Sequence, residues 1–334
     1  MPALRLTLAI EKLNFSAPFR IAGYVLEHQD ALLVTLEDGQ YRGRGEASGV
    51  FYLNDKVPGM AATIEALRGR IEAGIDRTEL QRLLPPGGAR NALDCALWEL
   101  EAQRSGRPVC SLAGIAAPRP LLTTFTLSAE EPAVMAAGAR RFADARALKV
   151  KLTGELELDR ARVTAIRAAR PDVWLGVDAN QGYKVQQLPA LIDILFGCRV
   201  ELIEQPLARG READLEGLKS PIPIAADESV LGLDEVAALV GRFDMVNIKL
   251  DKCGGLTEAL AMAHEARRLG MRVMVGNMMG SSLAMAPAFV LGQLCHVVDL
   301  DGPTFLTHDR SPGVEYRDGL IWCDERVWGG PRAG

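Results

Sequence analysis

The chain has 334 residues with a formal net charge of −5, and 48% of its residues are hydrophobic and 24% charged. These values fit a globular protein with one large domain and a smaller one. Because there is no basic block, we expect no nucleic-acid partner, and no apolar run reaches the ~18 residues of a membrane span. The six cysteines are scattered without a Cys-x-x-Cys pair, which indicates reduced core residues in a cytoplasmic protein rather than disulfides or zinc ligands.

The N-terminal part predicts a small α+β domain. Residues 4–10 alternate polar and apolar residues as a strand does, and the turn Glu37-Asp-Gly-Gln40 predicts a hairpin between two further strands. The apolar spacing then turns helical. We expect strands at residues 4–10, 31–36 and 41–46, an irregular segment at residues 14–20, and helices between Met60 and Ser105 with Asn91 as a helix cap.

After Pro118-Arg-Pro120 the pattern changes to strands that alternate with helices. Eight strands at near-regular spacing favour an α/β fold of the TIM-barrel type, (β/α)8, over an open doubly wound sheet. No Gly-x-Gly-x-x-Gly follows an early strand, which argues against a dinucleotide-binding fold. The expected strands are residues 121–127, 147–152, 173–178, 200–204, 222–227, 245–250, 272–276 and 297–300, with seven helical patterns between them.

Three successive strands of the predicted barrel each end in a carboxylate that burial of an apolar strand does not explain. These acids are Asp178, Glu204 and Asp227. In a parallel barrel the C-terminal ends of neighbouring strands lie side by side on one face, so the three acids would repel one another unless a cation joined them. One such acid alone would suit a helix cap or a solvated loop. Three at this spacing predict a site for a hard divalent ion such as Mg²⁺.

Lysines interrupt two other predicted strands. Strand two reads Ala147-Leu-Lys149-Val-Lys151-Leu, and strand six contains Lys249. Barrel strands are covered on both sides and rarely bury an unpaired lysine. Strands two and six lie opposite each other in an eight-strand barrel, so Lys151 and Lys249 could act as paired bases across its mouth. A nearby cation, either Lys149 or the metal, is expected to lower their pKa toward the ~7–8 of a general base.

Strand eight ends in Val297-Val-Asp299-Leu-Asp301-Gly-Pro, which puts Asp299 and Asp301 on a shared face of the barrel mouth. They are too far round the barrel to complete the cluster of three acids. An acidic pair without its own metal suits a substrate ammonium group. Taken alone, Asp301 is explained equally well by an Asp-Gly-Pro turn.

In this order, the motifs resemble those of the enolase superfamily and its muconate lactonizing enzyme subgroup. The Asp-x-Asp of residues 299–301 is similar to that of the dipeptide epimerases of the L-Ala-D/L-Glu type, and the resemblance covers essentially the whole chain. The other matching elements are Lys149-Val-Lys151, Asp178-Ala-Asn, Glu204-Gln-Pro, Asp227-Glu-Ser and Asn247-Ile-Lys249.

The resemblance implies an enolase-like modified barrel at residues 119–308, an N-terminal α+β capping domain at residues 1–118, and a C-terminal segment at residues 309–334 that returns to the capping domain. It also implies a role for each motif residue. The implied roles are Mg²⁺ ligands at Asp178, Glu204 and Asp227, acid/base lysines at Lys151 and Lys249, and an ammonium-binding pair at Asp299 and Asp301.

The implied activity is that of an isomerase that inverts the α-carbon of the C-terminal residue of a small dipeptide. Removing the α-proton builds charge on the carboxylate oxygens, and bound Mg²⁺ would stabilise that enediolate. One lysine takes the proton from one face and the other lysine delivers a proton to the opposite face. The default substrate is L-Ala-L-Glu, which would link the enzyme to recycling of cell-wall peptides.

Substrate selection is implied to lie in capping loops near residues 15–25 and 50–56. Arg20 is the candidate partner for a glutamate side chain, because an Arg–carboxylate pair is directional. The segment Phe51-Tyr-Leu-Asn54 is largely apolar and favours a hydrophobic second residue equally well. We also count Lys149 and Thr124 among the substrate-binding residues. Barrels of this kind often form homo-oligomers, but the sequence reveals no interface.

Several alternatives stay open. N-acylamino acid racemases, o-succinylbenzoate synthases and muconate cycloisomerases would use the same lysines and metal, but their substrates lack the free ammonium that Asp299 and Asp301 suit. Acid-sugar dehydratases rely on a histidine after strand seven, where none of the four histidines of this chain falls. From a different class, the barrel could be a catalytically inactive binding protein, against which the intact lysines and acids argue.

Overall fold

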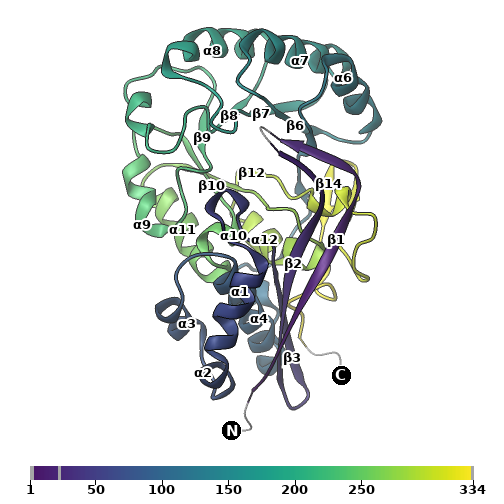
Figure 1. Ribbon diagram of the computed structural model, residues 1–334, viewed down its shortest axis with the longest axis vertical. Helices are drawn as coiled ribbons and strands as arrows, with labels where there is room; N and C mark the ends of the chain where they lie inside the picture. Colours follow the sequence, from purple (N-terminus) through teal and green to yellow (C-terminus); the bar gives the residue numbers. More distant parts are fainter. Residues whose placement is uncertain (1–3, 22–23, 332–334) are drawn as a thin grey trace.

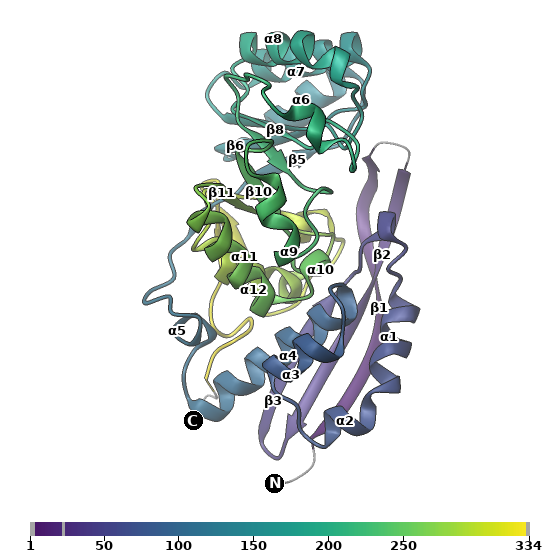
Figure 2. The ribbon, with the colours of Figure 1, turned by 90° about the vertical axis from the view of Figure 1, so that its left-hand side faces the viewer.

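The computed structural model describes residues 4–21 and 24–331, which form two packed bodies (Figure 1). The capping domain is an antiparallel sheet with helices against it. The second body is a curled sheet of parallel strands surrounded by helices. A long hairpin of the capping domain extends alongside the barrel (Figure 2).

The capping sheet contains three antiparallel strands. β1 (Arg5–Ile21) pairs with β2 (Tyr24–Asp38), with a register shift between Asn14 and Phe19. The irregularity predicted for residues 14–20 is therefore present as this register shift, but the strand continues beyond it. β3 (Tyr41–Ala47) pairs with the other side of β2.

Helix α4 (Gly88–Ser105) packs closely on β3. A Cβ atom at Gly43 or Gly45 would lie only 2.0 or 1.9 Å from a carbonyl oxygen of α4, so glycine permits this approach. The helix ends at the left-handed Gly106 as expected, but Asn91 lies inside it rather than at its cap. The other helical segments here are η1 (Phe51–Leu53), α1 (Val57–Ala66), α2 (Arg68–Glu72), α3 (Arg77–Leu83) and α5 (Val109–Leu112).

Eight parallel strands form the curled sheet of the barrel, in chain order from one edge to the other. A hydrogen bond from the Thr124 N–H to the Val298 carbonyl, 3.0 Å long, joins the two edges. The predicted barrel with an N-terminal α+β domain is confirmed. The strands are β5 (Phe125–Leu127), β6 (Ala147–Lys151), β7 (Trp174–Asp178), β8 (Leu202–Glu204), β9 (Ile224–Ala226), β10 (Met245–Ile248), β11 (Arg272–Val275) and β12 (Val297–Val298).

The helices around the barrel are less regular than predicted. Between β8 and β9 the described chain forms only the 3₁₀ segment η3 (Glu212–Leu215) instead of an α-helix. The remaining helical segments of the barrel are α6 (Pro132–Arg141), α7 (Leu156–Ala169), η2 (Val185–Gln187), α8 (Leu188–Gly197), α9 (Leu233–Val236), η4 (Ala237–Leu239), α10 (Leu250–Cys253), α11 (Leu256–Arg268), α12 (Ser282–Gly292) and η5 (Gly302–Phe305).

The C-terminal segment contacts both bodies. β13 (Glu315–Arg317) and β14 (Leu320–Trp322) form a small antiparallel sheet with β4 (Leu121–Leu122). The predicted first barrel strand is therefore split, with β4 in this sheet and β5 in the barrel. Farther on, the Trp328 indole N–H donates to the Arg44 carbonyl of β3 at 2.8 Å.

Two large apolar cores stabilise the chain, one inside and around the barrel and one between the capping sheet and its helices. All six cysteines are free, and none forms a disulfide. None of the helices in the described residues is both long and apolar enough to cross a membrane.

Candidate active site

Three acids lie side by side at the C-terminal ends of neighbouring strands. Asp178 and Glu204 end β7 and β8 and are register partners, and Asp227 directly follows β9. All three are at most 1% exposed, and one oxygen from each lies within 4.8 Å of the others. The backbone of the parallel sheet therefore brings together the predicted acids. Their buried, converging carboxylates provide the all-oxygen ligand set that a hard divalent cation prefers.

Mutual repulsion and burial act on these acids against the pull of nearby lysines. Burial and the Asp178 charge raise the pKa of Glu204 to about 8. Burial also raises the pKa of Asp178 and Asp227, but neighbouring ammonium groups outweigh it, and the net pKa of both is lowered. The backbone N–H of Asn180 donates to Asp178 and the Asn247 amide donates to Glu204, which fixes the direction of both carboxylates.

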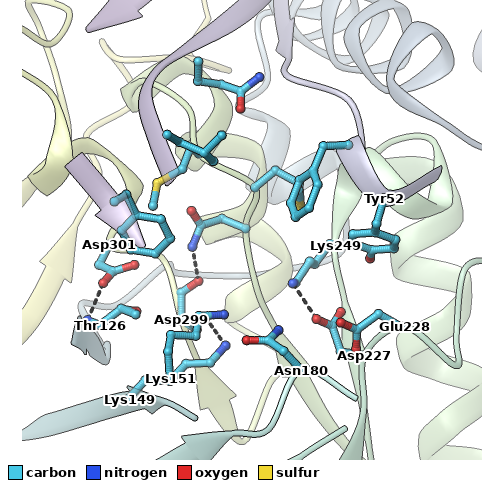
Figure 3. A pocket seen from close by; sticks show the side chains of 17 residues that line it. Tyr52, Thr126, Lys149, Lys151, Asn180, Asp227, Glu228, Lys249, Asp299 and Asp301 are labelled. Atoms are coloured by element: carbon cyan, nitrogen blue, oxygen red, sulfur yellow. Dashed lines mark hydrogen bonds and ion pairs between the residues drawn. The ribbon is translucent and has the colours of Figure 1, made fainter. Parts of the chain in front are cut away.

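The two lysines proposed as acid and base, Lys151 and Lys249, both reach into the pocket from separate strands (Figure 3). Lys151 ends β6 and its Nζ lies 2.6 Å from Asp178 Oδ2. Lys249 follows β10 and its Nζ lies 2.7 Å from Asp227 Oδ2. Three strands separate β6 from β10 in the eight-stranded sheet, so the two lysines approach the pocket from opposite walls.

As expected, the charge of Lys149 lowers the pKa of Lys249, but in the protein chain by itself the surrounding acids outweigh this effect. Burial lowers the pKa of Lys249, but Asp227, Tyr52 and Glu204 outweigh burial, and the net pKa is raised. Lys149 behaves alike, because Asp299, Glu204 and nearby acids outweigh its burial. The cause is the same in both cases, namely a dense group of carboxylates that favours the ammonium form.

The acids after β12 have unequal surroundings. Asp299 uses both side-chain oxygens, since Lys149 Nζ and Thr124 Oγ1 donate to it at 2.8 and 2.5 Å. Asp301 accepts one backbone N–H, that of Thr126, at 2.6 Å. Burial and the Asp299 charge raise the pKa of Asp301 to about 7. Thr124 lies behind Asp299 rather than among the pocket-lining residues, so it orients that carboxylate from behind.

A pocket opens over these groups, at the place where the barrel mouth meets the capping domain. Its barrel side is formed by the lysines and acids. Its capping side is mainly apolar and includes Phe19, Leu26 and Phe51 together with the amide of Gln29. The side chain of Arg20, the predicted partner of a glutamate substrate, lies outside the described residues.

Several polar groups of the site were not predicted from the sequence. Lys252 donates to the Asp227 side chain and carbonyl at 2.6 and 2.5 Å, and only its position one helical turn after Lys249 signals this. Glu228 and Tyr52 line the pocket, and each has a buried oxygen without a hydrogen-bond partner among the described residues. Burial and the Asp227 charge raise the pKa of Glu228 to about 7. In the sequence, Glu228 and Tyr52 directly follow Asp227 and Phe51, and nothing in their residue type distinguishes them as site residues.

The chain is similar in sequence to two characterised enzymes over nearly its whole length. It is 41% identical to the L-Ala-D/L-Glu epimerase of Escherichia coli (strain K12), with 91% of this chain and 95% of that protein covered. It is 37% identical to the N-acetyl-D-glutamate racemase of a Pseudoalteromonas species, with 90% and 95% covered.

The fold also matches a solved structure and a family model. An enolase family member from Agrobacterium tumefaciens with homology to dipeptide epimerases, crystallised with sodium and L-Ala-L-Glu, superimposes with a TM-score of 0.93 and 39% identity, over 98% of this chain and 100% of that one. The family model described as enolase C-terminal domain-like matches residues 134–326. The chain therefore belongs to the enolase superfamily, in its dipeptide epimerase group, and is an isomerase.

Proposed function

We propose that the chain is a Mg²⁺-dependent dipeptide epimerase that inverts the α-carbon of the C-terminal residue of dipeptides of the L-Ala-L-Glu type. The observation that carries this proposal is the placement of two lysines on opposite walls of one pocket, with three converging carboxylates between them. The relatives that act on or bind Ala-Glu dipeptides support the substrate class.

Asp178, Glu204 and Asp227 would hold the metal. Their buried oxygens fit it because three like charges converge, and burial together with the Asp178 charge raises the pKa of Glu204. When bound, Mg²⁺ would offset the charge of the acids, favour neutral lysine and stabilise the negative charge that develops on the substrate carboxylate.

The lysines would exchange protons with the substrate α-carbon. In one direction neutral Lys151 takes the α-proton while protonated Lys249 delivers one to the opposite face, and the roles reverse for the other epimer. Their ion pairs with Asp178 and Asp227 hold the two Nζ atoms at fixed positions on opposite walls. This arrangement inverts the centre, whereas a single base would exchange the proton with retention.

The substrate ammonium group would sit against Asp301, which lines the pocket and accepts hydrogen bonds from Thr126. Asp299 has both oxygens engaged by Lys149 and Thr124, and it would add negative charge nearby. A dipeptide with a free amino terminus matches this charge. Lys149 belongs to the buried strand β6 and lines the pocket. It would lie beside the substrate carboxylate.

A second candidate is racemisation of N-acyl amino acids. The specific observation in its favour is the 37% identity to an N-acetyl-D-glutamate racemase. The buried acids after β12 argue against it, because an N-acyl substrate brings no positive charge to them.

Exchange of the α-proton in D₂O tests the proposal. The wild type should incorporate deuterium into both epimers of Ala-Glu. Lys151→Ala and Lys249→Ala should each abolish epimerisation, while each should still exchange the one epimer whose α-proton faces the remaining lysine. Mass spectrometry and chiral chromatography measure the two outcomes. Epimerisation at the wild-type rate by either single variant would refute the two-lysine mechanism.

A further inference from the structure

A buried hydrogen-bonded junction joins the capping domain to the turn that carries Lys249. Asp251 lies two residues beyond Lys249 in α10 and is 7% exposed. Its Oδ1 accepts the backbone N–H groups of Ser48 and Gly49, both at 2.9 Å. The Ser48 hydroxyl in turn donates to the carbonyl of Met279, a residue that lines the pocket. Asp251 is not among the described residues that line the pocket, so its place in the site is indirect.

The loop that begins at this junction, residues 49–55, is a tight turn. It overlaps the second of the two predicted capping loops, and from here on the capping loop means residues 49–55. Gly49 has φ +70°, and a Cβ atom there would lie 2.2 Å from the Asp55 carbonyl oxygen. The N–H groups of Leu53 and Asp55 both donate to the Val50 carbonyl. At the far end, Asp55 accepts the Gly88 N–H at 2.8 Å. These two anchors therefore fix the two ends of the turn.

The capping loop places Tyr52 beside Lys249. In Figure 3 the Tyr52 ring stands next to the Lys249 side chain, and its hydroxyl points toward Asp227 and Glu228. That hydroxyl is buried and has no hydrogen-bond partner among the described residues. Asp55 and Gly88 both belong to the capping domain. The anchor at Asp251 is therefore the one that ties the loop to the element that holds Lys249.

We propose that Asp251 is a positioning residue, which holds the capping loop and Tyr52 over Lys249 and thereby sets proton transfer on the Lys249 face of the substrate. This inference rests on the two-lysine epimerisation proposed above. Without the carboxylate, two buried N–H groups would lose their acceptor, and the loop would have to move to satisfy them. A displacement of about 1 Å near reacting groups can lower a rate roughly a hundredfold.

The test measures exchange on each face separately. Adding Asp251→Ala to Lys151→Ala should lower the rate of deuterium exchange for the epimer that Lys249 serves by about tenfold or more. Adding it to Lys249→Ala should lower the exchange that Lys151 catalyses by much less. Asp251→Asn keeps an acceptor oxygen at the same place and should restore most of the lost exchange.

Asp76→Ala is the matched control, because Asp76 is an exposed carboxylate of the capping domain that also accepts a backbone N–H, that of Glu79 at 2.7 Å. This variant should change the rate of deuterium exchange on neither face of the substrate. Equal loss on both faces in the Asp251→Ala variants would overturn the inference, as would no loss on either. If the two single-lysine variants show no exchange with either epimer, the two-lysine mechanism fails, and the inference fails with it.

Discussion

The two proposed catalytic lysines differ in the space left around them. The Lys151 side chain is 12% exposed, and its ion pair is with Asp178, its register partner on the neighbouring strand β7. The Lys249 side chain is 8% exposed and is enclosed by the capping loop and by β11. At Gly276, directly after β11, an added Cβ atom would lie 3.0 Å from Lys249 Cε and 2.7 Å from Asn247 Oδ1. Glycine at position 276 therefore leaves space for the Lys249 side chain.

We therefore predict that Gly276→Ala lowers kcat by about tenfold with a smaller effect on KM, because it displaces the proton-transferring group rather than the substrate. Steady-state kinetics with L-Ala-L-Glu measure both constants. Gly197→Ala is the control, since a Cβ atom there meets nothing within 4 Å and the residue ends α8. An unchanged kcat in Gly276→Ala would show that Lys249 tolerates the displacement.

Residue type alone predicted part of this site. A lysine within a buried strand is anomalous, and so Lys149, Lys151 and Lys249 stood out as candidates. Lys252 did not, because a lysine in a short helical segment is ordinarily solvated. Only the three-dimensional structure shows that it is 2% exposed and donates to the Asp227 carbonyl.

At the scale of elements, the regular alternation of strands predicted the barrel, whereas tertiary pairing decided the exceptions. The helix expected between β8 and β9 shrinks to η3, because Gly210 and Gly217 on either side adopt the left-handed values φ +90° and +77°. The first predicted strand splits because Leu121 and Leu122 pair with β14 instead of the barrel. The pairing of Leu121 and Leu122 with β14 cannot be predicted from a local sequence pattern.

The segment after β12 gives the second prediction, because it holds two buried acids. N-acetylation of the dipeptide removes the ammonium group that Asp301 would bind, and we expect kcat/KM to fall by about tenfold or more. Asp301→Asn should reduce the difference in kcat/KM between the free and the acetylated substrate. Competitive turnover of the two substrates, followed by chiral chromatography, measures the ratio. An acetylated substrate processed as well as the free one would favour the N-acyl racemase function.

At the scale of the whole molecule, a divalent cation held by the three converging acids would stabilise the folded state. A ligand that binds only the folded state at a hundred times its Kd adds about 2.7 kcal/mol to the free energy of unfolding. We predict that chelation abolishes turnover and lowers Tm by a few degrees, and that added Mg²⁺ reverses both. Calorimetry and activity assays measure the effects, and Glu204→Gln should lose most of the Tm response. Full turnover in a preparation shown by elemental analysis to lack metal would contradict the prediction.

On the proposed function, the capping domain would set the choice of substrate, because its residues line one side of the pocket. The described capping side of the pocket carries Phe19, Leu26 and Phe51, and Phe19 stacks edge-on against Phe305 of the barrel with ring centroids 5.0 Å apart. This apolar surface would suit a hydrophobic second residue. The relatives that act on or bind Ala-Glu dipeptides point instead to a carboxylate side chain. A cation from the capping hairpin would reconcile the two, and Arg20, next to Phe19, is the candidate from the sequence.

We predict that wild type prefers L-Ala-L-Glu over L-Ala-L-Leu and L-Ala-L-Phe, and that Arg20→Ala selectively lowers kcat/KM for L-Ala-L-Glu by about tenfold or more. The loss corresponds to a charge-assisted hydrogen bond of ~1.5–3 kcal/mol. Arg42→Ala, on β3 of the same domain, is a control for the loss of one positive charge. If Arg20→Ala leaves the preference unchanged, another group binds the glutamate side chain. If wild type prefers leucine or phenylalanine, the apolar capping surface decides the choice, and the substrates are hydrophobic dipeptides rather than cell-wall peptides.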